Sequence, residues 1–587
     1  MNIATKGRAA TEDHRDGGRA LESDWRAIVP RVDADAGEAE PASGVSEISR
    51  TRLLDRPDEV RDAWRALSAL QASGFAVSAR TGRSLGPVRL TPEGKLLRAE
   101  PDNDDALLVQ LESYAVAYRF AWHPTSSGPP AALSCAAVRQ ARRVRVSRRV
   151  KLQLCLRGPS RRSLEFEVRD VSHQGLGLRC EAGAELLYPG QRVDDVTLSW
   201  KGGDALCGAA LIAHVTRDVE LGVVRVGLVL ELDASSREKW SALVDGLLHP
   251  NTRRGLPEPR ALWEAYVSSG YLNLSGKAPS DFESELDCFE DAQSRLRSAP
   301  DVGAFFAAGD STRLEAFGHQ LQVWPQSWLW YHLCRLPSGR SLRSSDDHVL
   351  VELYSRAYHY VRERGAKWLV TYIQKQAGYS RLVHHESALQ LQASGSACVV
   401  PLHVMEMSAL AEVGAPDPAV QRPSAAQAQR LRDSLASSYP RLYLEATGLA
   451  RGDGALDELC ELWAAHGLER ERAVFVAIRD GELVASAVLD SASSGLHLYG
   501  LLDCARIFVH APQAESYVAA LLGTAKRWYR ARGRTRFVYF RDARHDPIAE
   551  RRGGRLLGEA YLTVHSVEAI PQLLERVFLL SAPSVHP

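Results

Sequence analysis

The stretch RVSRRVKLQLCL covers residues 145–156, and the stretch FEVRDVSHQGLGL covers residues 166–178. The first contains an arginine pair in the pattern RxxxR, followed by apolar residues at alternate positions. The second contains the pattern DxSxxG at the end of another alternating segment. Alternation with period two predicts strands, and the glycine-containing segment predicts a tight turn between them. The sequence therefore predicts a small β domain with a basic entry strand and an acidic turn.

The chemistry of these two motifs suits a phosphate-bearing nucleotide. A guanidinium group bonds phosphate oxygens or a guanine edge in pairs, and its flat face stacks on a base. A carboxylate can accept hydrogen bonds from a base edge, a hydroxyl can donate or accept, and a glycine allows a left-handed turn. The candidate ligand-binding residues are Arg145, Arg148, Arg149, Asp170, Ser172 and Gly175.

Together, the two motifs and their spacing resemble the PilZ domain, a family of bacterial receptors for cyclic di-GMP. The resemblance implies that the chain binds cyclic di-GMP through these residues. Two alternatives stay open. The six arginines within Arg139–Arg149 could form a solvated basic face beside an ordinary hairpin turn. Arg139 and Arg143 also fit RxxxR, although the alternating segment follows directly only after the Arg145/Arg149 pair.

Composition describes an ordinary globular chain of several domains. The 587 residues are 45% hydrophobic and 25% charged, and Lys+Arg equals Asp+Glu at 72 each. This balance gives no overall field for nucleic acid, so no DNA partner is expected. The nine cysteines contain no CxxC pair, so no metal site is expected. No apolar run is long enough for a membrane span and the first residues lack a signal-peptide pattern, so a cytoplasmic location is expected.

The predicted architecture is multidomain, with two small β-barrels followed by duplicated α/β domains. The N-terminal β segment resembles the barrel that precedes PilZ in flagellar-brake proteins. Five regions are expected: a disordered tail (1–50), a small β-rich N-terminal domain (51–138), a PilZ domain (139–252), and two α/β copies (253–420 and 421–587).

The duplication rests on a faint internal repeat. The segment YVRERGAKWLVTY at 360–372 aligns with WYRARGRTRFVYF at 528–540, an offset of 168 (533 − 365). Each segment reads as the end of an amphipathic helix, a glycine cap and a buried strand. Chance similarity of two helix–strand units is the alternative.

The second copy adds a hairpin on the turn Asp480-Gly481. Its order of elements resembles the GNAT acyltransferase fold, and the tandem resembles the Fem-type transferases. That resemblance implies a pyrophosphate loop, but the matching positions, 510–515 and 336–342, lack its usual glycines. CoA binding is therefore not expected from a standard loop, whereas another acyl or aminoacyl donor stays open.

No catalytic constellation stands out, so the catalytic residues are left unassigned. Tyr561 and His565 could supply an acid or base, but a strand-edge position in the core is the simpler interpretation. His384 and His385 suggest a metal pair, but neighbours on a strand would point to opposite sides, which favours solvent exposure.

The leading functional prediction is a cyclic di-GMP effector that couples the messenger to motility, adhesion or polysaccharide output through its C-terminal half, with a protein partner. The first alternative is a cyclic di-GMP-gated acyl- or aminoacyltransferase. The second is a PilZ scaffold that has lost its ligand and acts through protein contacts alone.

Overall fold

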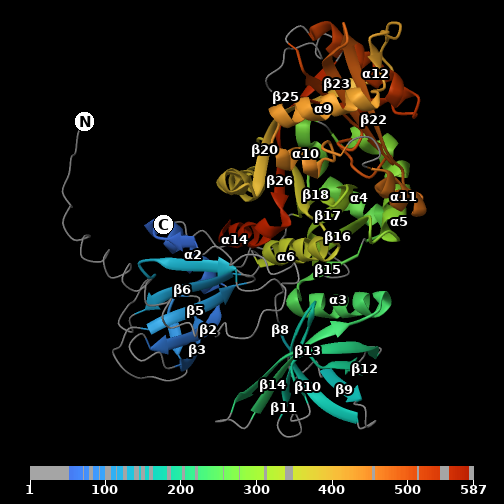
Figure 1. Ribbon diagram of the computed structural model, residues 1–587. Coiled ribbons are helices and arrows are strands. Elements are labelled where there is room, and N and C mark those ends of the chain that lie inside the picture. The colour runs from blue at the N-terminus through green and yellow to red at the C-terminus, as the bar shows by residue number, and fades with distance from the viewer. Residues whose placement is uncertain are drawn as a thin grey trace, which may run out of the picture. The chain divides into compact units, whose positions relative to one another are not determined.

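A computed structural model gives the structure of residues 52–580, except for gaps at 70–71, 79–83, 92, 99–106, 114–115, 123–128, 138–143, 147–151, 158–162, 181–186, 201–204, 219–222, 256, 277, 310–313, 337–347, 452–455, 512–513 and 543–553. The described residues fall into two compact units, which divide after Pro250. The first unit contains two β-sheets and the second contains one large mixed sheet (Figure 1). The predicted tail, 1–50, lies outside the described residues. None of the described helices has the length and apolarity needed to cross a membrane.

The N-terminal sheet is antiparallel and packs against one helix. Helix α2 (Pro57–Ala69) stacks Trp64 on Trp122, with ring centroids 5.4 Å apart. The sheet is open among the described residues, because β1 and β4, each three residues long, form its edges; the predicted barrel closure is not seen there. Its strands, in spatial order, are β1 (Arg52–Leu54), β7 (Leu133–Ala137), β6 (Val116–Trp122), β5 (Leu107–Ser113), β2 (Ser73–Ser78), β3 (Ser84–Leu90) and β4 (Leu96–Arg98).

The second of the two predicted barrels is present and closed. Six strands form its wall, and the pairing of β10 with β11 completes the ring. Alternate residues such as Leu154, Leu178 and Ile212 point into a shared core, as the period-two pattern requires. The strands, in ring order, are β9 (Leu152–Arg157), β10 (Ser163–Ser172), β11 (Gly175–Cys180), β14 (Val223–Glu231), β13 (Leu206–Asp218) and β12 (Arg192–Trp200), and the short β8 (Val144–Arg145) adds to β10.

One helix, α3 (Ala234–Leu248), follows the barrel strands. It begins at Asp233, whose side chain accepts a hydrogen bond from the Ser236 backbone N–H at 2.7 Å. The aspartate carboxylate therefore caps the first turn of α3. Trp240 and Val244 of α3 are buried in the barrel core.

The second unit contains a twelve-stranded mixed sheet (Figure 1). Its elements form two similar successions, which differ in their helices. The first succession consists of β15 (Thr252–Arg254), α4 (Pro259–Ser268), α5 (Leu286–Arg297), β16 (Gly303–Gly309), β17 (Leu314–Trp324), β18 (Ser327–Arg335), α6 (His348–Glu363), β19 (Trp368–Gln374), α8 (Glu386–Leu391) and β20 (Ala397–Ser408). The second consists of β21 (Val420–Gln421), α9 (Ala425–Ser438), α10 (Arg441–Ala446), α11 (Asp457–Ala465), β22 (Arg470–Arg479), β23 (Glu482–Ala492), β24 (Cys504–Val509), α12 (Glu515–Arg530), β25 (Arg536–Asp542), β26 (Gly554–Ser566) and α14 (Ile570–Leu580).

The two successions exchange their last strands. Strand β26 pairs with β19, and β20 pairs with β25, so each half of the sheet is completed by a strand from the other half. The two exchanged strands also pair with each other along Ala397–Met407 and Gly554–His565. This exchange joins both halves into one continuous sheet with a shared apolar core, which receives side chains from α5, α9, α10 and α11.

Candidate functional site

The hairpin of β10 and β11 brings the DxSxxG residues together (Figure 1). In this antiparallel pair Asp170 lies opposite Gly177, and Ser172 lies opposite Gly175. The register shifts between Val168 and Asp170, which marks a bulge just before the aspartate. A bulge re-aims the side chains that follow it. The carboxylate of Asp170 is therefore positioned by a local irregularity and not by regular strand geometry alone.

Two glycines in this hairpin are required by close contacts. A Cβ at position 175 would lie 1.9 Å from the carbonyl oxygen of Leu228 on β14. A Cβ at position 177 would lie 2.8 Å from both carboxylate oxygens of Asp170. Gly175 therefore lets two barrel strands approach each other, while Gly177 leaves room for the Asp170 carboxylate. The sequence interpretation included the first glycine, but for a left-handed turn, and this is wrong because Gly175 lies in strand β11 without a positive φ. It missed the second glycine, although the pattern GLG contains both.

The turn between the strands is held by its own polar contacts and by α3. The hydroxyl of Ser172 donates to the Gly175 carbonyl at 3.3 Å, and the side chain of Ser172 is buried. The indole N–H of Trp240 donates to the Ser172 carbonyl at 3.1 Å. In addition, His173 Nε2 lies 2.8 Å from a carboxylate oxygen of Asp245, and both side chains are largely buried. Ser172 thus shapes the turn, and the contacts from α3 could not be found from sequence because they join residues 68 and 72 positions apart.

The arginine motif enters beside this hairpin. Strand β8 pairs with β10, so that the Cα atom of Arg145 lies opposite that of Asp170. The next residue, Val146, extends this pairing by donating its backbone N–H to the Arg169 carbonyl at 2.9 Å. Arg148 and Arg149 lie outside the described residues, as do Arg139 and Arg143 of the alternative register. The structure therefore places the main chain of Arg145 beside the main chain of Asp170.

The histidines and tyrosine considered in the C-terminal half lie differently from the sequence interpretation. His384 and His385 belong to a π-helical turn, Arg381–His385, and not to a strand. His384 is buried and its Nε2 lies 3.2 Å from the Tyr354 hydroxyl, so the expected solvent exposure is wrong for this residue. The rings of Tyr561 and His385 pack in a tilted arrangement, with their centroids 4.1 Å apart. His565 is buried.

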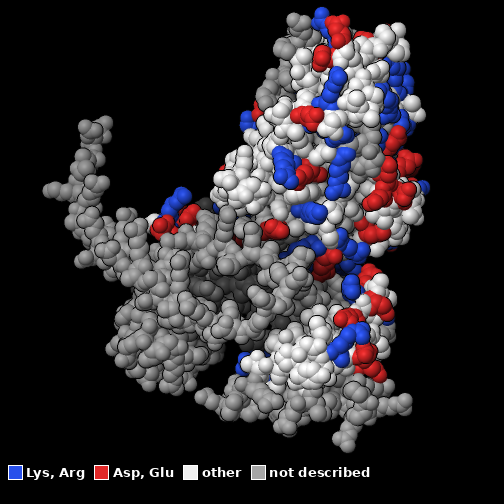
Figure 2. Space-filling view, in the orientation of Figure 1, with Lys and Arg blue, Asp and Glu red and all other residues white. Residues whose placement is uncertain are grey.

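Among the described residues, no three His, Cys, Asp or Glu side chains gather as metal ligands. Positively and negatively charged side chains are interspersed over the visible described face of the second unit (Figure 2). That face therefore lacks the continuous basic patch that a nucleic-acid interface usually carries. Of the two segments aligned with a pyrophosphate loop, 336–342 lies outside the described residues except for Leu336, and 510–515 is described except for 512–513.

Comparison with known proteins gives solved structures of low similarity. No family model and no curated protein matches the chain. The structures include the MrkH–c-di-GMP complex of K. pneumonia (11% identity, 34% of this chain and 97% of that chain, TM-score 0.29) and YcgR of Escherichia coli in complex with c-di-GMP (14%, 33% and 92%, TM-score 0.25). They also include a GCN5-related N-acetyltransferase from Sphaerobacter thermophilus (13%, 54% and 96%, TM-score 0.31). These scores are too low to assign a ligand or an activity to this chain.

Proposed function

We propose that the chain is a regulatory protein that binds cyclic di-GMP at the barrel. The observation that carries the proposal is the pairing of β8 with β10, which sets Arg145 opposite Asp170. Two motifs separated by about twenty residues in sequence are thereby neighbours in space. A guanidinium group can recognise a phosphate or guanine N7/O6, and a carboxylate can recognise the N–H edge of guanine.

In this proposal the motif residues have distinct roles. Arg145, Arg148 and Arg149 bind the phosphates and stack on or bond to the guanine bases. Asp170 accepts hydrogen bonds from a guanine edge, with its carboxylate accommodated by the bare Gly177 backbone. Ser172 and Gly175 hold the turn that presents the aspartate. In this proposal the regions 51–138 and 139–252 form the input part. The regions 253–420 and 421–587 form the output part. The output, on motility, adhesion or polysaccharide, would pass through the C-terminal half or a protein partner.

Calorimetric titration of the full chain with cyclic di-GMP tests this proposal, with GTP and cyclic di-AMP as ligand controls. Loss of a charge-assisted arginine contact costs roughly 1.5–3 kcal/mol, which is about ten- to hundredfold in affinity. We expect that loss for Arg145→Ala and for Arg149→Ala. Arg139→Ala is the matched control from the same basic segment and should bind like the wild type.

Two outcomes would contradict the proposal. Absence of binding by the wild-type chain at micromolar ligand would reject the nucleotide site. A normal affinity of Arg145→Ala combined with a weakened Arg139→Ala would reject the chosen register. Asp170→Asn provides a further check, because it keeps the shape of the side chain but removes the charge that favours guanine N–H donors; we expect weaker binding.

A further inference from the structure

A row of paired residues crosses the outside of the barrel beside the proposed nucleotide site. Asp170 on β10 lies opposite Gly177 on β11, and Gly177 lies opposite Gly227 on β14. Gly227 in turn lies opposite His214 on β13. The four strands are neighbours in the barrel wall (Figure 1). The row therefore runs from the carboxylate of the DxSxxG motif to a histidine that belongs to neither sequence motif.

The positions of this row face the outside of the barrel. The residues that flank the two glycines belong to the barrel core: Leu176, Leu178, Val226 and Leu228. Because side chains alternate along a strand, Gly177 and Gly227 face outward. His214 follows a register shift between Ile212 and His214, and it is exposed. A ligand on the outer surface of the barrel can therefore reach its imidazole.

Each glycine of the row is covered by a polar side chain from the next strand. The carboxylate of Asp170 occupies the space in front of Gly177, as described above. A Cβ at position 227 would lie 2.0 Å from Cε1 and 2.5 Å from Nδ1 of His214. Neither glycine has a positive φ, so the backbone conformation does not require them. What the two glycines provide is room for the carboxylate and for the imidazole.

These two contacts bring the carboxylate of Asp170 and the imidazole of His214 towards each other. Three strand steps separate the Cα atoms of the two residues. Each side chain, however, covers one member of the same glycine pair, so the two groups lie roughly one strand spacing, about 5 Å, apart. The outer surface therefore presents an acceptor and a flat aromatic ring side by side, above bare backbone.

This combination of groups suits a purine base. The edge of guanine carries N–H donors, which a carboxylate accepts. Its π face stacks on aromatic side chains, and histidine is one of the residues that proteins use for such stacking. Glycine has no side chain to hold a flat base away from the backbone. The carboxylate and the imidazole can therefore contact the edge and the face of bound nucleotide bases at one place on the barrel.

We propose that His214 is a further ligand-binding residue of the nucleotide site, and that its imidazole stacks on a guanine base of the ligand beside Asp170. Gly227 keeps the space in which the imidazole lies. This inference rests on the proposed binding of cyclic di-GMP. It adds to that site a residue from β13, a strand that contains neither of the two sequence motifs.

Calorimetric titration of the full chain with cyclic di-GMP tests the role of His214. His214→Ala should weaken binding about five- to tenfold, because the stacking of a base on an aromatic ring is lost. His214→Phe keeps a flat ring without the nitrogens and should bind like the wild type. Cys207→Ala is the matched control, because it truncates an exposed side chain of the same strand roughly 20 Å away. It should bind normally.

A variant of Gly227 tests how the imidazole is held in place. Gly227→Ala puts a methyl group where the ring of His214 lies. Because this ring is exposed and can turn away, the barrel should still fold, which thermal unfolding checks, while the affinity falls. In the His214→Ala background the same methyl group should cost less affinity. Equal losses in the two backgrounds would overturn the role given to Gly227.

The outcomes separate this inference from the proposed function. Binding by the wild type together with an unchanged affinity of His214→Ala would overturn the inference and leave the proposed function standing. Absence of binding by the wild type would reject both. A loss for His214→Phe as large as that for His214→Ala would overturn the stacking role, because a flat ring alone would then not support binding.

Discussion

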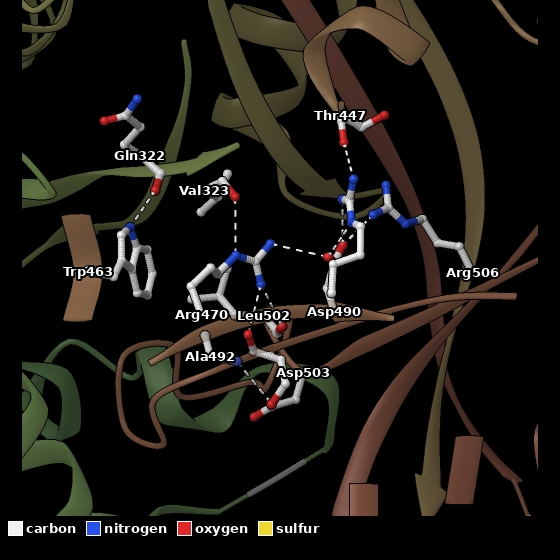
Figure 3. Close-up of polar contacts among 12 residues, drawn as sticks. Gln322, Val323, Thr447, Trp463, Arg470, Asp490, Ala492, Leu502, Asp503 and Arg506 are labelled. Atoms are coloured by element: carbon white, nitrogen blue, oxygen red, sulfur yellow. Dashed lines mark hydrogen bonds and ion pairs between the residues drawn. The ribbon is translucent and has the colours of Figure 1, made fainter. Parts of the chain in front are cut away.

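The two halves of the twelve-stranded sheet have similar orders of elements but different interiors. In the first half, the neutral side chains of Tyr331 and His332 line a cavity whose walls both halves provide. The second half is filled at its centre by the buried carboxylate of Asp490, which is surrounded by arginines (Figure 3). The interior of the first half is therefore open and neutral, and that of the second half is closed and ionic. The difference lies in the side chains and in the connections between strands.

The ionic centre of the second half is held by several strong contacts. Arg472 donates to the two oxygens of Asp490 at 2.8 and 3.0 Å, and Arg506 binds the second oxygen as well. Arg470 lies 3.5 Å from the same carboxylate and donates to the carbonyl of Val323 on β17 (Figure 3). The cluster thus connects the second half to the first as well as stabilising its own strands.

A pair of histidines shows the same contrast. Each half has a histidine shortly after the place where its two parallel strands part, His332 in the first and His510 in the second. Ser434 and Ser486 approach the ring nitrogens of His510 at 2.7 and 2.8 Å, so both are bonded. One ring nitrogen of His332, in contrast, is unpartnered among the described residues. The two histidines therefore differ in that both ring nitrogens of His510 are bonded, whereas, within the described part of the chain, only one of His332 is.

The connections between strands explain how the halves came to differ. In the first half β17 and β18 are joined by a tight turn at Pro325-Gln326. In the second half the corresponding connection, residues 493–503, is long and contributes His497 and Tyr499 to the cavity of the first half. Residues of the second half therefore form part of the wall of this cavity.

The largest effect is expected from Asp490→Asn. The substitution keeps the shape of the side chain but leaves the buried Arg470 and Arg506 and the part-buried Arg472 without their counter-charge. Loss of one partner of a buried ion pair costs about 3–5 kcal/mol. Hydrogen–deuterium exchange of peptides from β22 and β23 in the full chain should report this loss as a lower free energy of opening.

Asp480→Asn is the matched control, because it makes the same chemical change in the same hairpin. The Asp480 side chain is 90% exposed and its backbone φ of +51° suits asparagine equally well. We expect a change within about 0.5 kcal/mol. Equal costs for the two substitutions would show that charge does not stabilise the second half.

Much of this framework could be predicted from the sequence, because local patterns encode it. The helix–glycine–strand repeat corresponds to α6 with β19 and to α12 with β25. Leu353 and Leu521 of these helices are buried, as expected for amphipathic helices. The exchange of β20 and β26 was not predictable, since both strands have similar apolar patterns and only tertiary contacts select their neighbours.

Part of the candidate site at the barrel could also be predicted from the sequence. The motif residues Asp170 and Gly175 could be found from their spacing, and the structure brings Arg145 to the same place. The part played by Gly177 depends on where the Asp170 carboxylate lies, which a sequence does not state. The cavity was missed because Tyr331 and His332 lie in a strand that reads as apolar core, and a bulge leaves no local signal.

The next prediction concerns pH and separates the buried histidines His319 and His497 from Asp490 by the pH range in which each group titrates. Burial lowers the pKa of both His319 and His497 to about 3. Their neutral forms stabilise the fold fully above about pH 6.5, and this contribution is lost as the pH falls. The pKa of Asp490 is lowered by its arginines despite its burial, so its contribution is lost only below the ordinary carboxyl range.

His497→Asn tests this by removing one titrating group. The asparagine oxygen can still accept a hydrogen bond from the Tyr499 backbone N–H, as His497 Nδ1 does at 3.3 Å. Each buried histidine should contribute about 1 kcal/mol of destabilisation between pH 6.5 and 5.5, because the unfolded histidine is already half protonated at pH 6.5. The variant should therefore lose about 1 kcal/mol less stability than the wild type over this range, measured by exchange of β17 and β18 peptides. Identical losses would show that His497 does not titrate on unfolding in this range.

The smallest effect is expected from removing one hydroxyl in each half. In the second half Tyr529 is fully buried and its hydroxyl donates to the Asp490 carbonyl at 2.8 Å. Tyr529→Phe should cost about 1–1.5 kcal/mol, because that carbonyl loses its partner in the core. Tyr331→Phe should cost nothing measurable or stabilise slightly, since its hydroxyl has no partner among the described residues and is desolvated without compensation. Thermal unfolding of the two full-length variants, in the absence of any ligand, compares them directly. A larger loss for Tyr331→Phe would mean that the first half already uses its hydroxyl internally, and the contrast between an open and a closed interior would then fail.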